Sequence, residues 1–503
     1  MIWETIEQVL PRNSIRARFA TNAFWSVVGA SISQGFALVA AIVAARVLGQ
    51  AGFGQLAVVQ STVGMFGIFA GMGLGLTATK HIAELRSTDP KKAGRILGLS
   101  LAVALISGGL ASVALFLMSP LLAVVVFRTS DLAPILKISS VLLFSNTLYG
   151  LGTSSLVGFE TFKSIAKVGI LTGLLSVLLV SFGALYGGLY GAVCGMAAAS
   201  AAGGVLCHTV LLKKARDYGV PIVWRDIRHE LPVVWTFAIP GCLSSGIVLP
   251  VTWLVHIMLV REANGFSQLG LFHAATRFQV PLRLVGSTLG LSLLPVLVSE
   301  RARGGNARFG RVNILLSWSL GAIPVLLLLA FPGLMAVLFG SQYGGMGSAR
   351  VLSLVLLYTV IILYKQGLAR VLAAENLMWW GVLSNTVWAI LLLSSFYWLR
   401  HSGAVGLAGS FLISYAASTA LFVPIYAWKG LAPRGTLISR EAAVVWGAIA
   451  LAAGLAFFEA RTAVRAVGFV LALAVVCGAF WRLFRGKSGA GVVAEGQSVP
   501  CLR

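Results

Sequence analysis

The sequence predicts an all-α polytopic membrane protein with about fourteen transmembrane helices, arranged as two six-helix bundles plus two C-terminal helices. Of its 503 residues, 58% are hydrophobic and only 11% are charged, and the mean hydropathy is +0.92. A soluble protein of this length could not bury so much apolar surface. Apolar runs of about 20 residues, the length that crosses a bilayer as a helix, recur along almost the whole chain.

Runs with few or no charges define the individual helices in order. The stretch 168–212 is too long for one span, and glycines around Gly187 and Gly188 predict a turn that divides it. The apolar segment 120–134 contains two prolines and is too short to span, so we expect an external loop with a half-buried piece there. The predicted spans are 22–45, 53–78, 97–118, 135–157, 168–186, 189–212, 233–260, 269–298, 312–332, 350–372, 379–399, 405–428, 442–459 and 464–484.

The distribution of basic residues predicts the orientation. The formal net charge is +23, but the lysines and arginines are scattered through short connections between spans, which argues against nucleic-acid binding. Alternate connections are rich in basic residues, as in Lys80–Arg95 and Lys213–Arg228, whereas the others have mostly single charges such as Arg46 and Arg261. By the positive-inside rule, both termini are expected to be cytoplasmic and the protein to lie in the inner (cytoplasmic) cell membrane.

The two halves of the chain resemble each other at a shift of about 213 residues. The hexamer Ala51–Leu56 matches Asn264–Leu269, and Val126-Phe127 matches Leu338-Phe339 in the same order. Six spans separate each element from its copy, so the repeat is parallel, with a pseudo-two-fold axis along the membrane normal. The expected domains are a cytoplasmic N-terminal segment, two six-helix bundles joined by a cytoplasmic linker, additional helices 13 and 14, and a disordered cytoplasmic tail: 1–21, 22–212, 213–232, 233–428, 442–484 and 485–503.

Cationic side chains inside the spans are the candidate substrate ligands. Arg277 and Arg283 are the only charged residues between 263 and 299, so no nearby carboxylate can pair with them. An unpaired charge inside a bilayer usually faces a water-filled cavity or a partner, and guanidinium groups suit phosphate oxygens. His273 lies one helical turn before Arg277, and Lys365 and Arg370 lie in a later span. For Arg283 and Arg370, snorkelling toward an interface is an equal alternative.

Two segments resemble the Wzx-type oligosaccharide flippases of the multidrug/oligosaccharidyl-lipid/polysaccharide exporter superfamily. The first reads Arg46-Val-Leu-Gly49-x-x-Gly52-Phe53-Gly54, then Gly71-x-Gly73-x-Gly75 and Lys80-x-x-Ala83-Glu84. The second reads Ala275-Thr276-Arg277-Phe278, then Pro281, then Leu294-Pro295.

The resemblance implies an inverted-V transporter with a cationic central cavity, which flips a polyprenyl-pyrophosphate-linked oligosaccharide from the cytoplasmic to the outer leaflet. Arg277 would then be a cavity arginine of the eighth helix. The expected partners are this lipid-linked cargo, membrane lipid, and polysaccharide polymerase and chain-length proteins, with the transporter itself a monomer.

Two other functions are compatible with the architecture. A cation-coupled multidrug exporter would favour a carboxylate deep in a span, but all fifteen acidic residues fall in predicted loops or helix ends. A membrane enzyme of the same pathway would be expected to have a large external loop with catalytic side chains. The five cysteines show no metal-type spacing, and we expect no enzyme activity, cofactor or metal site. The sequence does not identify the sugar.

Overall fold

The computed structural model describes residues 15–71, 73–224, 227–230, 246–284, 286, 307–331, 333–375, 377–431, 435–458 and 462–485, and the regular structure in them is helical. The predicted tail after 485 and most of the N-terminal segment lie outside these residues. The α-helices are α2 (Ile15–Gly71), α3 (Leu74–Leu85), α4 (Pro90–Leu121), α5 (Leu132–Gly158), α6 (Phe162–Asp217), α9 (Val248–Val260), α10 (Gly265–Thr276), α12 (Ala307–Leu329), α13 (Leu334–Phe339), α14 (Met346–Ala374), α15 (Met378–Leu399), α16 (Gly403–Trp428), α17 (Arg440–Phe457) and α18 (Thr462–Arg485). Short π or 3₁₀ helices are η1 (Leu122–Val126), η2 (Ile227–Glu230), η4 (Ser341–Tyr343) and η5 (Arg400–Ser402).

The predicted spans correspond to these helices. Within the described residues, nine helical stretches are long and apolar enough to cross a membrane, and Trp379–Trp428 contains both α15 and α16. α2 and α6 each contain two spans, separated at Gly49 (φ 71°) and Gly188 (φ 55°). Glycine adopts this left-handed backbone without steric penalty, so the turn predicted near Gly188 is confirmed. Together with α9 and α10, these stretches agree with the prediction of about fourteen spans.

The expected external loop at 120–134 is wrong, because most of this segment is helical. α4 continues through Pro120 to Leu121, and η1 extends it to Val126. A proline inside a helix leaves the carbonyl four residues earlier, here that of Phe116, without its backbone donor. The Ser119 hydroxyl donates to the Phe116 carbonyl at 2.7 Å, which satisfies that oxygen and lets the helix continue.

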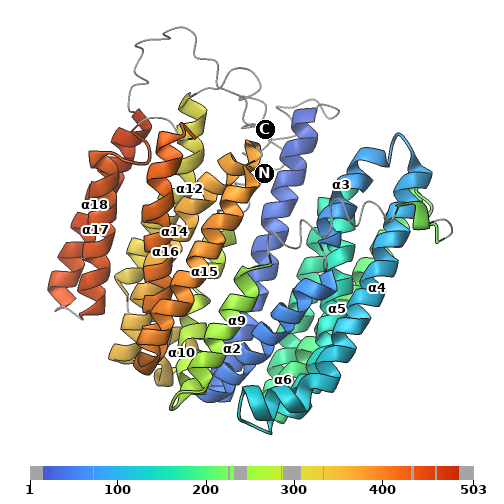
Figure 1. Cartoon of the computed structure of the whole chain (residues 1–503), viewed down its shortest axis with the longest axis horizontal. Helices are drawn as coiled ribbons and strands as arrows, with labels where there is room; N and C mark the ends of the chain where they lie inside the picture. Colours follow the sequence, from blue (N-terminus) through green and yellow to red (C-terminus); the bar gives the residue numbers. More distant parts are fainter. Residues whose placement is uncertain are drawn as a thin grey trace.

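The described helices form two bundles that converge at one end. α2 to α6 make the N-terminal half, α9 to α16 make the C-terminal half, and α17 and α18 pack on α12 and α14. The halves contact each other mainly where α2 meets α9, α10 and α13. Figure 1 shows the two bundles meeting at the lower end of the view, near the labels of α2, α9 and α10, and we call this end the closed end. The arrangement agrees with the two predicted bundles and the added C-terminal pair.

Glycines bring the two halves into backbone contact at the closed end. A Cβ atom on Gly54 of α2 would lie 1.8 Å from the Phe266 carbonyl oxygen of α10. A Cβ on Gly270 of α10 would lie 2.0 Å from the Gln50 carbonyl oxygen of α2. Small residues permit such close helix packing inside membranes, so any larger side chain here would push the halves apart.

Parts of the seventh and eighth predicted spans lie outside the described residues. For span 233–260, the structure describes α9 and the two residues before it, and Pro250 lies in the first turn of that helix. Pro240, in the same predicted span, lies outside them. For span 269–298, the described part ends at residue 286 and includes both predicted arginines.

Candidate functional site

A break in the eighth span positions Arg277. α10 ends at Thr276, and the backbone N–H groups of Arg277 and Phe278 bond to carbonyls only three residues earlier, each at 3.2 Å. Pro281 explains the break, since its ring would collide with the Arg277 carbonyl four residues before it in a regular helix. That carbonyl accepts instead from the Val280 N–H at 3.3 Å. The guanidinium therefore projects from the end of a helix inside the membrane-spanning part of the chain.

Arg277, His273 and Gln60 form one polar cluster between the halves. An Nη2 of Arg277 donates to the Gln60 amide oxygen at 2.9 Å and also contacts the His273 Nε2. The same amide oxygen lies 3.2 Å from the His273 Nε2. Phe53 packs against the His273 ring with 5.1 Å between ring centroids, which fixes the imidazole from the other half.

The cluster contains no carboxylate. None of the ion pairs between described residues involves Arg277, and its Nε is buried without a hydrogen-bond partner. A buried guanidinium donor without an acceptor is costly, whereas an anionic oxygen would satisfy it. The geometry therefore suits capture of an anion.

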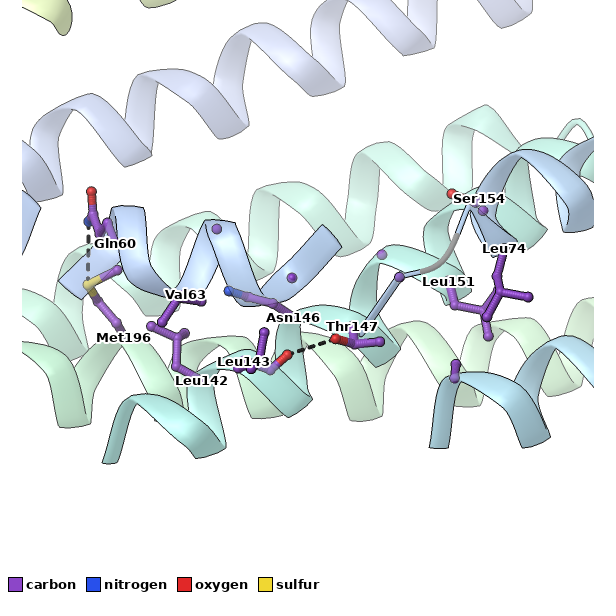
Figure 2. A pocket seen from close by; sticks show the side chains of 16 residues that line it. Gln60, Val63, Leu74, Leu142, Leu143, Asn146, Thr147, Leu151, Ser154 and Met196 are labelled. Carbon is purple, nitrogen blue, oxygen red and sulfur yellow. Dashed lines mark hydrogen bonds between the residues drawn. The ribbon is translucent and has the colours of Figure 1, made fainter. Parts of the chain in front are cut away.

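A cavity of about 440 Å³ in the N-terminal half begins at Gln60. Figure 2 shows Gln60 at one end and Ser154 at the other, with Asn146 and Thr147 between them. None of the lining residues is charged, and the wall from α2 presents glycines in place of side chains. The lining consists of Gln60, Val63, Gly64, Gly67, Gly71, Leu74, Gly75, Ala104, Leu142, Leu143, Asn146, Thr147, Gly150, Leu151, Ser154 and Met196.

A second cationic group, Arg283 with Lys365, lies in the C-terminal half. The Lys365 ammonium donates to the hydroxyls of Ser384 and Ser418 at 3.4 Å each and lies 5.7 Å from the centre of the Tyr415 ring. Arg283 lies on the same half, and its side chain is exposed. The Tyr415 ring thus stabilises the positive charge of Lys365 without neutralising it.

Arg370 lies in a different environment, although it follows Lys365 by only five residues. Its side chain is buried and donates from Nε to the Asn313 amide oxygen at 2.7 Å. Its Nη2 donates to the Asn313 carbonyl at 3.1 Å and to the Ser317 hydroxyl. These bonds connect α14 to α12, and they support a structural role for Arg370 over its predicted role as a substrate ligand.

The sequence interpretation missed Gln60, the residue that joins Arg277 to the cavity. Gln60 and His273 are 213 residues apart and lie in hydrogen-bond contact. This separation equals the predicted shift between the two halves. Residues at equivalent positions meet where a pseudo-two-fold axis passes between them, so the repeat itself was the signal that could have identified Gln60.

Comparison with known proteins gives the chain clear relatives. Residues 19–300 match the family described as "Polysaccharide biosynthesis protein". The EPS I polysaccharide export inner membrane protein EpsE of Ralstonia nicotianae is 25% identical over 423 residues, which cover 80% of this chain and 93% of that protein. The EpsE protein of Ralstonia solanacearum is 24% identical over 282 residues, covering 56% of this chain and 64% of the relative.

Solved structures share the fold at low sequence identity. An inward-facing multidrug resistance MATE family transporter of the MOP superfamily superposes with a TM-score of 0.67 at 16% identity, covering 81% of this chain and 98% of that one. The lipid II flippase MurJ in an inward closed conformation also gives a TM-score of 0.67, at 12% identity, covering 90% of this chain and 98% of that one. These similarities show that the chain shares the fold of these two proteins.

Proposed function

The chain belongs to the polysaccharide biosynthesis protein family, the Wzx-type family that its motifs resemble, and we propose that it flips a polyprenyl-pyrophosphate-linked oligosaccharide across the inner membrane. The cargo moves from the cytoplasmic to the outer leaflet by alternating access through the space between the two halves. The protein acts as a transporter and not as an enzyme, as a monomer beside the polymerase and chain-length proteins that use the delivered glycan.

The observation that carries this proposal is the cluster of Arg277 and His273 on the Gln60 amide, at one end of an uncharged cavity. A lipid-linked oligosaccharide is chemically divided in the same way, into a diphosphate with negative charge and a glycan rich in hydroxyl groups. The cluster fits the first part, and the cavity fits the second.

The diphosphate would bind to the free donors of Arg277. The guanidinium has five N–H groups in a fork that matches phosphate oxygens in pairs, and its Nε is unused. At about 4 Å and an effective dielectric constant near 20, one such charge pair contributes about 4 kcal/mol, which offsets part of the cost of desolvating the diphosphate. Arg283 and Lys365 supply further positive charge along the C-terminal half.

The neutral cavity would accommodate the sugars next to the diphosphate. Asn146, Thr147 and Ser154 place amide and hydroxyl groups along its wall, and glycines of α2 leave room for a ring to approach the backbone. Hydroxyl-bearing groups need such partners when they leave water, because an unpaired buried hydroxyl costs about 1–3 kcal/mol.

The described acidic residues argue against a cation-coupled drug exporter. Each one lies in a connection or in the first or last turn of a helix, so the described span interiors contain no carboxylate that could bind a proton, sodium or a cationic drug. They are Glu84, Asp89, Asp131, Glu160, Asp217, Glu230, Glu262, Glu375 and Glu441.

The proposal is tested in a strain that lacks the gene, by mass spectrometry of its polyprenyl-linked intermediates. Loss of the transporter should cause one lipid-linked oligosaccharide to accumulate, and its mass would identify the sugars. The wild-type chain should reverse the accumulation and the Arg277→Ala variant, expressed to the same level, should not. Unchanged lipid pools together with new drug sensitivity would contradict the proposal and favour the exporter.

A further inference from the structure

Arg46 joins the two halves at the closed end. It lies in α2 just before the break at Gly49, and its side chain is exposed. Its Nε donates to the Leu338 carbonyl at 2.8 Å and its Nη2 donates to the Val337 carbonyl at 2.6 Å. Both carbonyls belong to the last turn of α13, where a helix has no backbone donors left for its own oxygens.

Arg261 makes the same contact in the opposite direction. It caps the C-terminus of α9, the first described helix of the C-terminal half, and it is also exposed. Its Nε donates to the Val126 carbonyl at 2.9 Å and its Nη2 to the Val125 carbonyl at 3.0 Å. These oxygens lie at the end of η1, in the N-terminal half.

The two contacts are related by the internal repeat. Arg46 and Arg261 are 215 residues apart, and their acceptors Val126 and Leu338 are 212 residues apart, close to the shift of about 213. Each half therefore presents one arginine at the end of its first helix and one pair of helix-terminal carbonyls, and each arginine reaches the carbonyls of the other half. Such reciprocity is what a two-fold relation requires of a shared interface.

Other contacts make the same end tight. The Tyr343 hydroxyl, on a fully buried side chain, donates to the Gly49 carbonyl at 3.3 Å, and Gln50 donates to the Gln342 carbonyl. All of these donors and acceptors lie in opposite halves, so separation of the halves at this end must break them together. The side chains of Arg46 and Arg261 are exposed, whereas the Tyr343 side chain is fully buried, so the arginines can exchange the carbonyls for water.

We propose that Arg46 and Arg261 are paired latches that hold the closed end shut, each by binding two terminal carbonyls of the opposite half. Because their acceptors are neutral and their side chains reach water, the latches open without leaving a buried charge. Each contributes separately to the balance between the closed form and a form open at this end. The inference concerns the closed end alone and does not depend on which cargo crosses.

The test measures how often the closed end opens. Ala45, which is fully buried there and whose carbonyl lies 3.5 Å from the Tyr343 hydroxyl, is replaced by cysteine in a chain whose native cysteines are removed. The rate of maleimide labelling is measured on purified protein in lipid nanodiscs for Arg46→Ala, Arg261→Ala and the double variant. Arg350→Ala is the matched control, because Arg350 is a half-buried arginine near this end whose guanidinium donates to Met346 and lies over the Phe457 ring, both C-terminal to the linker between the halves.

Each single substitution should accelerate labelling, and the double variant should label about tenfold faster than the parent. The free-energy contributions of the two arginines add, so their effects on the population of the open form multiply. The labelling rate of Arg46→Lys should lie between those of the parent and Arg46→Ala, since an ammonium keeps the charge but cannot donate from two fixed positions. A double variant that labels at the rate of the parent or of the Arg350→Ala control would overturn the proposal.

A second measurement separates opening from unfolding. Spin labels at Ser130→Cys and Ser402→Cys, two exposed positions in connections of opposite halves, report the distance across this end. In the double variant the distribution should gain a second, longer and well-defined population. An unchanged distribution would contradict the latches, and a featureless broad one with a lowered unfolding temperature would show that the arginines maintain the fold and not the gate.

Discussion

Replacement of Arg277 by lysine is the most informative single change in the candidate site. Lysine keeps the positive charge but has no planar fork of N–H donors. Its ammonium can donate to the Gln60 amide oxygen or to a phosphate oxygen, but it cannot bind both in the geometry of the guanidinium. One charge-assisted hydrogen bond is lost, at about 1.5–3 kcal/mol. At about 1.4 kcal/mol for each factor of ten, transport should fall by roughly 10- to 100-fold.

Alanine at the same position removes the charge as well. The lost pair is worth about 4 kcal/mol at an effective dielectric near 20, so transport should fall by roughly 1000-fold. The assay uses proteoliposomes that contain the lipid-linked oligosaccharide isolated from the deletion strain, with exposure of the glycan on the far leaflet read by a sugar-oxidising enzyme. Arg482→Lys, on the exposed surface of α18, provides a control that keeps the net charge.

The order of the two variants decides the interpretation. If lysine transported as well as arginine, charge alone would suffice and the two-point geometry would be irrelevant. If alanine transported as well as arginine while the Arg482→Lys control behaved normally, Arg277 would have no part in translocation. Equal loss in both variants, with a lowered unfolding temperature, would indicate a structural role.

Three further changes test separate parts of the structure. Gly54→Val introduces a side chain 1.8 Å from the Phe266 carbonyl oxygen and should keep the closed end apart, seen as faster labelling of a cysteine at that end. Asn146→Leu should lower transport of the full oligosaccharide but leave binding of a polyprenyl diphosphate that bears no sugar unchanged in a filter assay. Arg370→Met leaves the buried Asn313 amide oxygen without its Arg370 donor and should lower stability by about 2–4 kcal/mol. The loss is measured as a lowered unfolding temperature, with normal transport per folded molecule.

The sequence predicted the helices and the position of the break better than it predicted contacts between helices. Hydropathy identifies spans, and Gly188 and Pro281 identify interruptions, because these signals depend on local chemistry. The error at 120–134 had a local cause too, since the effect of Pro120 depended on whether the Ser119 hydroxyl would satisfy the freed carbonyl.

Which faces of the helices meet could not be derived from hydropathy, because lipid-facing and protein-facing sides of a membrane helix are both apolar. Arg46 and Arg261 therefore looked like isolated charges in external loops, although each binds carbonyls of the opposite half. Arg370 looked equivalent to Lys365, and only the packing of α12 against α14 distinguishes them.

The place of Arg277 at the end of α10 has an electrostatic consequence. Aligned peptide dipoles give a helix C-terminus about half a negative elementary charge, which stabilises a cation within the adjacent turn. Arg277 is the residue that caps this terminus. The partial negative charge of the helix terminus offsets only part of the positive charge of the guanidinium. The buried cation is therefore stabilised and still attracts anions, whereas the full negative charge of a carboxylate partner would have cancelled this attraction. An interrupted helix thus provides a counter-charge that can never be protonated, so its contribution should be the same at every physiological pH.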